Sequence, residues 1–256
     1  MAPLQAAVES ENLEIVKLLL SSEKININHY CKIEKGEASS NNYYYIKETA
    51  LHLAISKINI EIVKVLLQNK NIDVNIPLIS YDRSIETDYL CSDKDVIEYN
   101  TPVLILALSK KNLEIVKLLL DNKKLDINIC MKKNYNWEGR SSSTSSSSYE
   151  EVMPALYYVI NQYLDNSLRF VKLLLENDKI DVNAPYKKKS VSSGEKNPKL
   201  KIGFPLHLAV SINNIEILKL LLQNKNINVN VIDDSGKKPI DYADKKEKKQ
   251  LLMNYS

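Results

Sequence analysis

Tyrosines and the single tryptophan are the residues of this sequence best suited to chemistry, and that chemistry is molecular recognition. Three tyrosines are consecutive at residues 43–45, and Trp137 stands between Tyr135 and Tyr149. Such side chains offer rigid contact area that is apolar on the ring and polar at one end, which suits protein-binding surfaces. The alternative is that the rings pack the segments that carry them against one another. For the set as a whole, we expect contact with a partner.

Histidine and cysteine side chains are too dispersed for a metal site. His29, Cys31, Cys91 and Cys130 lack the paired ligand spacing of zinc sites. The sequence also lacks the G-x-x-x-x-G-K-[ST], G-x-S-x-G and H-E-x-x-H patterns of phosphate-binding, hydrolase and metalloprotease sites. With five glycines in total, it has no material for a Gly-rich phosphate cradle. We therefore predict no catalytic residue, no metal and no cofactor.

Composition favours an intracellular protein. The formal net charge of +3 over 256 residues is too near balance to indicate a nucleic-acid partner. The three cysteines form no disulfide framework, which fits a reducing compartment. No signal peptide is visible, and the longest apolar run, residues 103–108, is far shorter than the roughly 20 residues of a membrane span. We predict a cytoplasmic location with the nucleus as the alternative, and the abundance of Lys, Asn, Ile and Tyr suggests a protozoan source.

An internal repeat defines the elements that must position the aromatic residues. The string LEIVKLLL occupies residues 13–20 and 113–120, and close variants occupy residues 60–67, 168–175 and 215–222. A short apolar segment precedes each copy, and a string ending in Asn, such as Asp73-Val-Asn75, follows it. Two short helices cannot bury this much apolar surface alone, so the copies are predicted to stack into a solenoid.

The strings TALHLA at residues 49–54 and FPLHLA at residues 204–209 resemble the TPLHLA signature of ankyrin repeats, and LEIVKLLL resembles the second helix of that family. The resemblance implies that His52 and His207 bond the backbone of neighbouring turns. Asparagine stands near the place of the glycine that usually follows the second helix, and we expect it to adopt the left-handed backbone conformation that ends a helix. These residues are Asn69, Asn122, Asn177 and Asn224.

The segments between repeats are unusually long. Corresponding residues of successive second helices are 47, 53, 55 and 47 residues apart, whereas an ankyrin repeat is about 33 residues long. The excess lies after each exit turn, where ankyrin proteins carry their finger loops. Insertions that recur on one edge of a stack are typical of a binding face.

The resemblance also implies that binding residues follow the Ala of each first helix, beside the aromatic residues of the inserted loops. The predicted partner-binding residues are Tyr43, Tyr44, Tyr45, Tyr81, Tyr89, Tyr135, Trp137, Tyr149, Tyr186, Ser56, Lys57, Ser109, Lys110, Ser211 and Ile212.

The sequence thus predicts an all-α ankyrin-repeat solenoid, with long β-hairpin-like loops, in one domain over residues 1–256. We expect a non-catalytic scaffold that binds another protein through its concave surface and its elongated loops, without a small-molecule substrate. The alternative is an ankyrin fragment or adaptor module of a larger assembly. The predicted repeats cover residues 1–28, 48–75, 100–128, 152–183 and 203–230, with a C-terminal cap at 234–254 and inserted loops at 29–47, 76–99, 129–151 and 184–202.

Overall fold

The structure is a computed structural model that describes residues 2–35, 42–88, 91–138, 146–162, 167–194, 197–212 and 214–255. The chain forms two compact units. Unit 1 comprises Met1–Asp126, Met131–Glu150 and Val191–Lys196, and unit 2 comprises Ile127–Cys130, Glu151–Ser190 and Asn197–Ser256. Each unit is described by itself.

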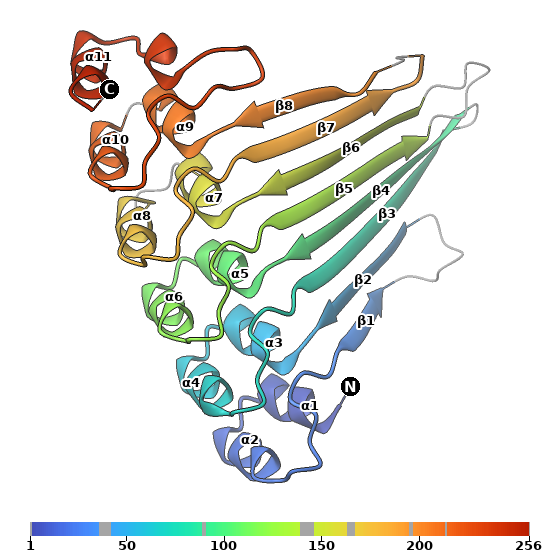
Figure 1. Cartoon of the computed structure of the whole chain (residues 1–256). Helices are drawn as coiled ribbons and strands as arrows, with labels where there is room; N and C mark the ends of the chain where they lie inside the picture. Colours follow the sequence, from blue (N-terminus) through green and yellow to red (C-terminus); the bar gives the residue numbers. More distant parts are fainter. Residues whose placement is uncertain are drawn as a thin grey trace. The chain divides into compact units, whose positions relative to one another are not determined.

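Helix pairs alternate with pairs of strands along the chain (Figure 1). The helix pairs are α1 (Pro3–Glu9) and α2 (Leu13–Leu20), α3 (Ala50–Ser56) and α4 (Ile60–Gln68), α5 (Val103–Ser109) and α6 (Leu113–Leu120), α7 (Ala155–Asn161) and α8 (Ser167–Leu175), and α9 (Pro205–Ser211) and α10 (Ile215–Leu222). The strands are β1 (Cys31–Lys35), β2 (Asn42–Glu48), β3 (Leu78–Asp88), β4 (Cys91–Thr101), β5 (Met131–Glu138), β6 (Ser146–Met153), β7 (Tyr186–Ser192) and β8 (Lys199–Gly203). A 3₁₀ turn, η1 (Pro239–Tyr242), and α11 (Lys246–Met253) follow α10.

The prediction of an all-α fold is wrong, because the inserted segments form an antiparallel sheet of eight strands in chain order. In unit 1, β3 and β4 pair in continuous register, from Leu78 opposite Thr101 to Asp88 opposite Cys91. Strand β2 also pairs with β3 in continuous register. In unit 2, β7 pairs with β8 from Tyr186–Gly203 to Ser190–Lys199. The physical reason is that each hairpin leaves unpaired N–H and C=O groups along its edges, which a neighbouring hairpin satisfies.

Asparagine starts the second helix of a repeat. The Oδ1 of Asn12 accepts a hydrogen bond from the N–H of Ile15 at 3.0 Å, which satisfies one of the donors left free at a helix start. Asn59, Asn112 and Asn214 cap α4, α6 and α10 in the same way. The recurring Asn before each Leu-Glu or Ile-Glu pair therefore fixes where the second helix begins.

The prediction of left-handed asparagines after the second helix is also wrong. Asn69 has φ −70° and ψ 127°, and its Oδ1 accepts from the N–H of Asn71 at 2.9 Å, which makes an Asx turn instead. The equivalent asparagines 122, 177 and 224 make the same bond. Positive φ occurs instead between the two helices, at Glu11, Ile58 and Lys111.

A second set of asparagines joins consecutive repeats. The Nδ2 of Asn75 donates to the carbonyl of Lys124 at 2.8 Å, and its Oδ1 accepts from the N–H of Asp126 at 2.8 Å. We call such a residue an asparagine bridge, because one carboxamide satisfies two backbone groups of the next repeat. The bridges are Asn28 and Asn75 in unit 1, and Asn128 and Asn183 in unit 2.

The core of each unit lies within and between helix pairs. In unit 1, Leu51, Ile55 and Ile62 are nearly inaccessible to solvent, and in unit 2, Leu174 and Ile217 are. Burial of such side chains contributes about 1.5–3 kcal/mol each. The helices therefore hold the bases of the hairpins, and the hairpins carry the candidate site.

Candidate functional site

Consecutive tyrosines of β2 point to opposite faces of the sheet, because side chains alternate along a strand. Tyr45 lies opposite Tyr81 of β3, and Tyr43 lies opposite Arg83. Tyr44 lies opposite Asp82 on the other face. The predicted set of aromatic residues is therefore divided between two faces.

A tyrosine cluster occupies one face of unit 1, formed by Tyr43, Tyr45 and Tyr81. The rings of Tyr45 and Tyr81 stack with centroids 5.0 Å apart, and Tyr43 lies 5.9 Å and 6.1 Å from them at tilted angles. Offset and edge contacts of this kind are favourable for aromatic rings. Tyr43 is 9% exposed and is the buried member of the cluster, while Tyr45 and Tyr81 are half-buried. The two stacked rings are the part of the cluster that solvent reaches.

Cations surround the tyrosine cluster. The ammonium group of Lys32 lies 4.7 Å from the ring centroid of Tyr45, Lys47 lies 5.6 Å from the same ring, and Arg83 lies 5.7 Å from Tyr43. Lys32 also donates a hydrogen bond to the hydroxyl of Tyr43 and forms an ion pair with Glu34. Hydrogen bonds to Glu34 and Tyr43 raise the pKa of Lys32, so its charge is fixed at neutral pH.

A second aromatic pair lies in β5 and β6 of unit 1. The rings of Tyr135 and Tyr149 stack with centroids 4.9 Å apart, and the hydroxyl of Tyr135 donates to Asp95 at 2.8 Å. Burial, and then the hydrogen bond to Asp95, raise the pKa of Tyr135 to about 12. The ammonium group of Lys133 lies 5.4 Å from the ring of Tyr149 and 5.3 Å from that of Tyr99. Lys133 and Tyr99 were not among the predicted partner-binding residues, and only the strand pairing of β4 with β5 places them together.

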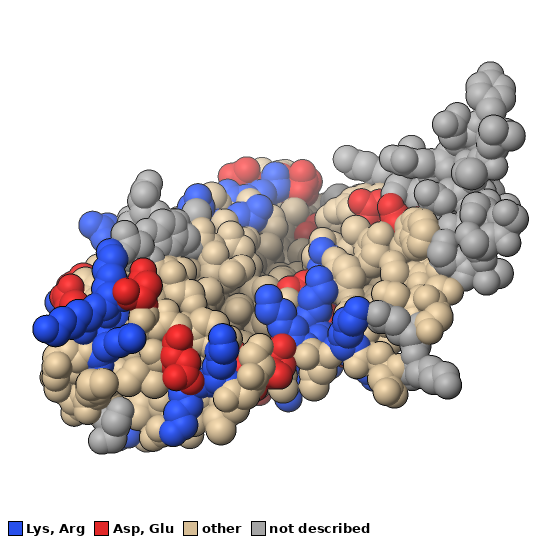
Figure 2. Space-filling view, turned by 90° about the horizontal axis from the view of Figure 1, so that it is seen from above, with Lys and Arg blue, Asp and Glu red and all other residues tan. Residues whose placement is uncertain are grey.

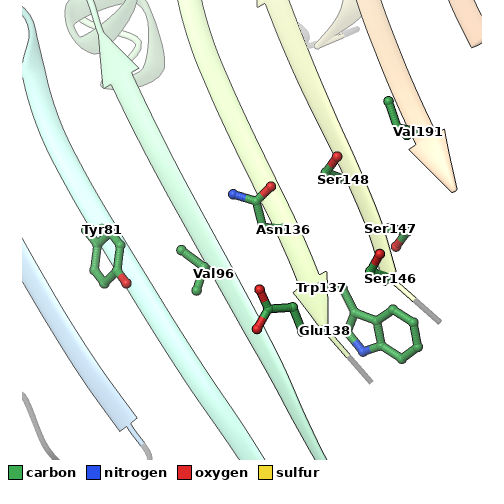
Figure 3. A pocket seen from close by; sticks show the side chains of 9 residues that line it. All are labelled: Tyr81, Val96, Asn136, Trp137, Glu138, Ser146, Ser147, Ser148 and Val191. Atoms are coloured by element: carbon green, nitrogen blue, oxygen red, sulfur yellow. The ribbon is translucent and has the colours of Figure 1, made fainter. Parts of the chain in front are cut away.

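Trp137 contributes to a pocket of about 420 Å³ in unit 1 (Figure 3). Its lining side chains come from β3 to β7, and Trp137, Tyr81 and two valines give it an apolar part. A carboxylate, an amide and serine hydroxyls give it a polar part. The lining residues are Tyr81, Val96, Asn136, Trp137, Glu138, Ser146, Ser147, Ser148 and Val191.

Tyr186 has a different environment, in unit 2. It is 8% exposed, its ring stacks on Tyr157 with centroids 4.9 Å apart, and its hydroxyl donates to Glu151 at 2.7 Å. A Cβ on Gly203 would come within 3.1 Å of the Tyr157 hydroxyl, so this glycine leaves room for the stacked pair. Tyr186 is thus mainly a packing residue. Tyr89 lies outside the described residues.

The predicted first-helix positions lie at helix C-termini. In unit 1, the Lys57 ammonium lies 3.3 Å from Glu9 and 3.7 Å from Glu11, and the Ser109 hydroxyl donates to the carbonyl of Leu106. Ser56 ends α3 and Lys110 follows α5. In unit 2, the Ser211 hydroxyl donates to the carbonyl of His207, and the carbonyl of Ile212 accepts from Lys248.

Of the two motif histidines, His207 bonds the backbone of a neighbouring turn as the resemblance implied, whereas His52 bonds the start of its own helix. The Nδ1 of His52 accepts from the N–H of Thr49 at 3.0 Å, and burial lowers the pKa of His52 to about 4. In unit 2, His207 Nε2 bonds the carbonyl of Lys237 at 3.0 Å. Within the described residues, no three His, Cys, Asp or Glu side chains converge as a metal site requires. No helix in that part of the chain is long and apolar enough to cross a membrane.

Basic and acidic side chains are interspersed on the face seen in Figure 2. This agrees with the formal net charge of +3. Exposed ion pairs such as Lys64 with Glu61 and Glu114, at 3.0 Å and 3.1 Å, contribute to the mixture.

Comparisons with known proteins support the repeat family. The family described as ankyrin repeats (3 copies) matches residues 1–77, and the family described as ankyrin repeat matches residues 204–234. A crystal structure of EF0377, an ankyrin repeat protein, aligns with a TM-score of 0.55 and 19% identity, over 99% of this chain and 98% of that one. The human ASB11 ankyrin repeat domain aligns with a TM-score of 0.40 and 17% identity, over 100% and 98% of the two chains. The search of curated proteins gave no match.

The repeated strings, the helix pairs and the family matches agree with one another. Ankyrin repeats generally mediate contacts between proteins, and the surfaces of their stacks serve as binding surfaces. Ankyrin repeats are thus identified in this chain over residues 1–77 and 204–234.

Proposed function

We propose that this protein is a non-catalytic scaffold that binds another protein through the inserted hairpins and the adjoining first-helix ends of its repeats. The stacked, half-buried pair of Tyr45 and Tyr81 is the observation that supports this best. Paired strands fix both rings, so little conformational entropy is lost when a partner docks. Tyrosine in such a setting is typical of binding hot spots.

The site residues divide into two roles under this proposal. Tyr43 and Tyr186, which are 9% and 8% exposed, support neighbouring side chains. Tyr45, Tyr81, Trp137 and Lys110 supply contact area to the partner. Lys57, already paired with Glu9 and Glu11, lies at the rim of that area.

The test compares two double variants of unit 1. Tyr45→Ser with Tyr81→Ser removes the stacked pair of the tyrosine cluster, and Tyr135→Ser with Tyr149→Ser removes the equivalent pair on β5 and β6. Proteins captured from the source cell by the unaltered chain are purified, and their dissociation constants are measured directly. We expect at least a tenfold loss of affinity for the first variant. A partner that binds both variants as tightly as the unaltered chain would contradict the proposal.

A second candidate is the adaptor module of a larger assembly. It is favoured by the exposure of Ile15 and Leu18, which are 45% and 71% accessible, whereas Ile62 at the same repeat position as Ile15 is 0% accessible. Another helix pair stacked on α2 would cover these side chains. Sedimentation that shows a strict monomer at all concentrations, with cooperative unfolding, would count against this second candidate.

We also propose an intracellular location for the chain. Cys31, which forms no disulfide, supports this, since reducing compartments keep cysteines as thiols. Imaging of the tagged chain in its source cell would test it, and secretion into the medium would contradict it.

A further inference from the structure

A small pocket lies in unit 1 where β1 and β2 meet the first helices. It has a volume of about 190 Å³ and shares no lining residue with the pocket of Trp137, and it is joined to the tyrosine cluster only through Lys32. Ile33 and Leu53 give it apolar walls. The lining residues are Gln5, Cys31, Lys32, Ile33, Glu48 and Leu53.

Glu48 is a buried carboxylate in this pocket. It is 6% exposed, and no hydrogen bond or ion pair joins its carboxylate to any residue among those the structure describes. Burial raises the pKa of Glu48, and the nearby charge of Glu9 raises it further. The carboxylate has lost part of its hydration without a compensating bond, which disfavours its charged form.

Two lysines of unit 1, one in the pocket lining and one paired with Glu9, have their ammonium groups engaged elsewhere. Lys32 lines the pocket, but its ammonium group is held by Glu34 and by the hydroxyl of Tyr43. The ammonium group of Lys57 is held between Glu9 and Glu11. Neither lysine therefore pairs with Glu48, and no other ion pair reaches it from the described residues of unit 1.

The other polar atoms around the pocket are acceptors or are already bonded. The Nε2 of Gln5 donates to the carbonyl of His29 at 2.6 Å, while the Oε1 of this buried side chain has no partner. The Sγ of Cys31 accepts from the N–H of Ala2 at 3.1 Å. An occupant must therefore supply hydrogen-bond donors and positive charge, and it must carry an apolar stem that fits against Ile33 and Leu53.

We propose that this pocket binds a lysine side chain of a protein partner, with the ammonium group on Glu48 and the methylene stem against Ile33 and Leu53. This inference rests on the proposed scaffold function and names the chemistry of the partner. Lysine suits a pocket of about 190 Å³ better than arginine, because its ammonium group is compact, whereas a guanidinium is a wider planar group with five donors to satisfy. The stem of lysine is also suited to apolar walls, with its charge at the far end.

The first experiment uses the free protein and the side-chain analogue n-butylammonium. Binding is followed by NMR shifts of the amide of Glu48 and the methyl groups of Ile33 and Leu53, with 1-butanol and butyrate as uncharged and anionic analogues. We expect saturable shifts with n-butylammonium only, and at least a tenfold weaker affinity in Glu48→Gln. Glu23→Gln, which removes an exposed carboxylate of the same unit, is the matched control and should bind like the unaltered chain. Equal affinity in Glu48→Gln, or equal binding of 1-butanol, would overturn the assignment.

Within the chain, the side chain of Lys57 is the competing ligand for Glu48. Its ammonium group has to leave Glu9 and Glu11 to reach that carboxylate. Lys57→Met distinguishes the two cases. If Lys57 occupies the pocket in solution, this variant binds n-butylammonium more tightly than the unaltered chain, and the proposal falls. If the pocket awaits a partner, its affinity for the amine changes less than twofold.

The second experiment separates this inference from the scaffold function. Once a partner is identified, its contacting lysine is replaced by methionine, and affinity is measured against the unaltered chain and Glu48→Gln. We expect each change to weaken binding at least tenfold and the pair together to weaken it no further. A partner that binds the tyrosine cluster and ignores both changes would overturn the lysine pocket and leave the scaffold function intact. If the chain binds n-butylammonium but no protein partner is found, the scaffold function is overturned and the amine-binding pocket stands.

Discussion

The helices and the hairpins of unit 1 use repetition in opposite ways. Helices α2 and α6 have identical sequences and identical asparagine caps, so each copy forms the same second helix of a repeat. Tyr43, Tyr44 and Tyr45 are identical neighbours, yet they face different sides of the sheet and contact different residues. Repetition in the helices therefore marks the supporting stack, whereas the hairpins give identical side chains different surroundings, which suits specific recognition.

The largest effect on the free energy of unfolding should come from substituting the same isoleucine in α6 and in α2 and comparing the two losses. Ile115 is 0% exposed, while Ile15, at the same position of the same sequence, is 45% exposed. Ile115→Ala should lower the free energy of unfolding by about 2–5 kcal/mol, because it leaves a cavity. Ile15→Ala should lower it by less than about 1 kcal/mol, and urea unfolding of both variants measures the difference. Equal losses would mean that another surface covers Ile15 in solution.

Acid should weaken the stack through His52. Its folded pKa of about 4 lies below its unfolded value, so the folded state binds fewer protons between these two values. Stability should therefore be complete above about pH 6.5 and should fall as the pH drops towards 4, by up to roughly 3 kcal/mol.

The control for this pH dependence is His52→Gln, because Gln5 fills the same position in the first repeat. Unfolding curves between pH 4 and 7 should be flatter for the variant. Glu48 has the opposite effect on the pH dependence. Because its pKa is raised in the folded state, stability falls as the pH rises above the pKa that Glu48 has in the unfolded chain. A pH profile unchanged by His52→Gln would refute the assignment to His52.

The asparagine bridges should contribute less than the core. Asn75→Ala removes two hydrogen bonds to the next repeat and should cost about 1–2 kcal/mol. Asn230 ends the last exit string, and among the described residues its side chain has a single hydrogen bond, which it accepts from Lys238 at 3.0 Å. Asn230→Ala should therefore cost less than about 0.5 kcal/mol. Thermal unfolding of the two variants tests this order.

The smallest expected effect is a gain in stability from a substitution in the turn between the two helices of a repeat. Lys111 has φ 56°, whereas Lys110 has φ −77°. Lys111→Gly should stabilise the chain by about 0.5–1 kcal/mol, because glycine adopts positive φ without strain. Lys110→Gly should destabilise it by a similar amount, because glycine loses more entropy on folding. Stabilisation by both substitutions would show that the backbone strain lies elsewhere.

Sequence reasoning was strongest where the signal was local. The periodicity of residues 60–67 and the Asn before each second helix define helices and caps, because those bonds span only a few residues. Hairpin-like loops were predicted, but the joining of the hairpins into one sheet was missed, because β2 and β3 pair across the helix pair α3 and α4. Three consecutive tyrosines give no apolar–polar alternation, so β2 shows no strand pattern until Tyr45 is known to lie opposite Tyr81.

The same limit applies to the candidate site. A glutamate at the start of a predicted repeat suggests a solvated charge, and only the fold places Glu48 in a pocket with Gln5, Cys31 and Leu53, where it is 6% exposed. Positive φ at Ile58 was equally hidden, since a β-branched residue is among the least suited to that conformation. The tyrosines were recognised from composition, but their division between two faces depends on register.

The asparagine bridges also bear on how the protein responds to pulling. Each bridge joins only a repeat and its successor, so a load along the stack passes through the bridges one after another. Links in series share the same force, and the weakest of them yields first. In single-molecule stretching, each unit should therefore lengthen in repeat-sized steps, and Asn75→Ala should lower the force of one of those steps without altering the others.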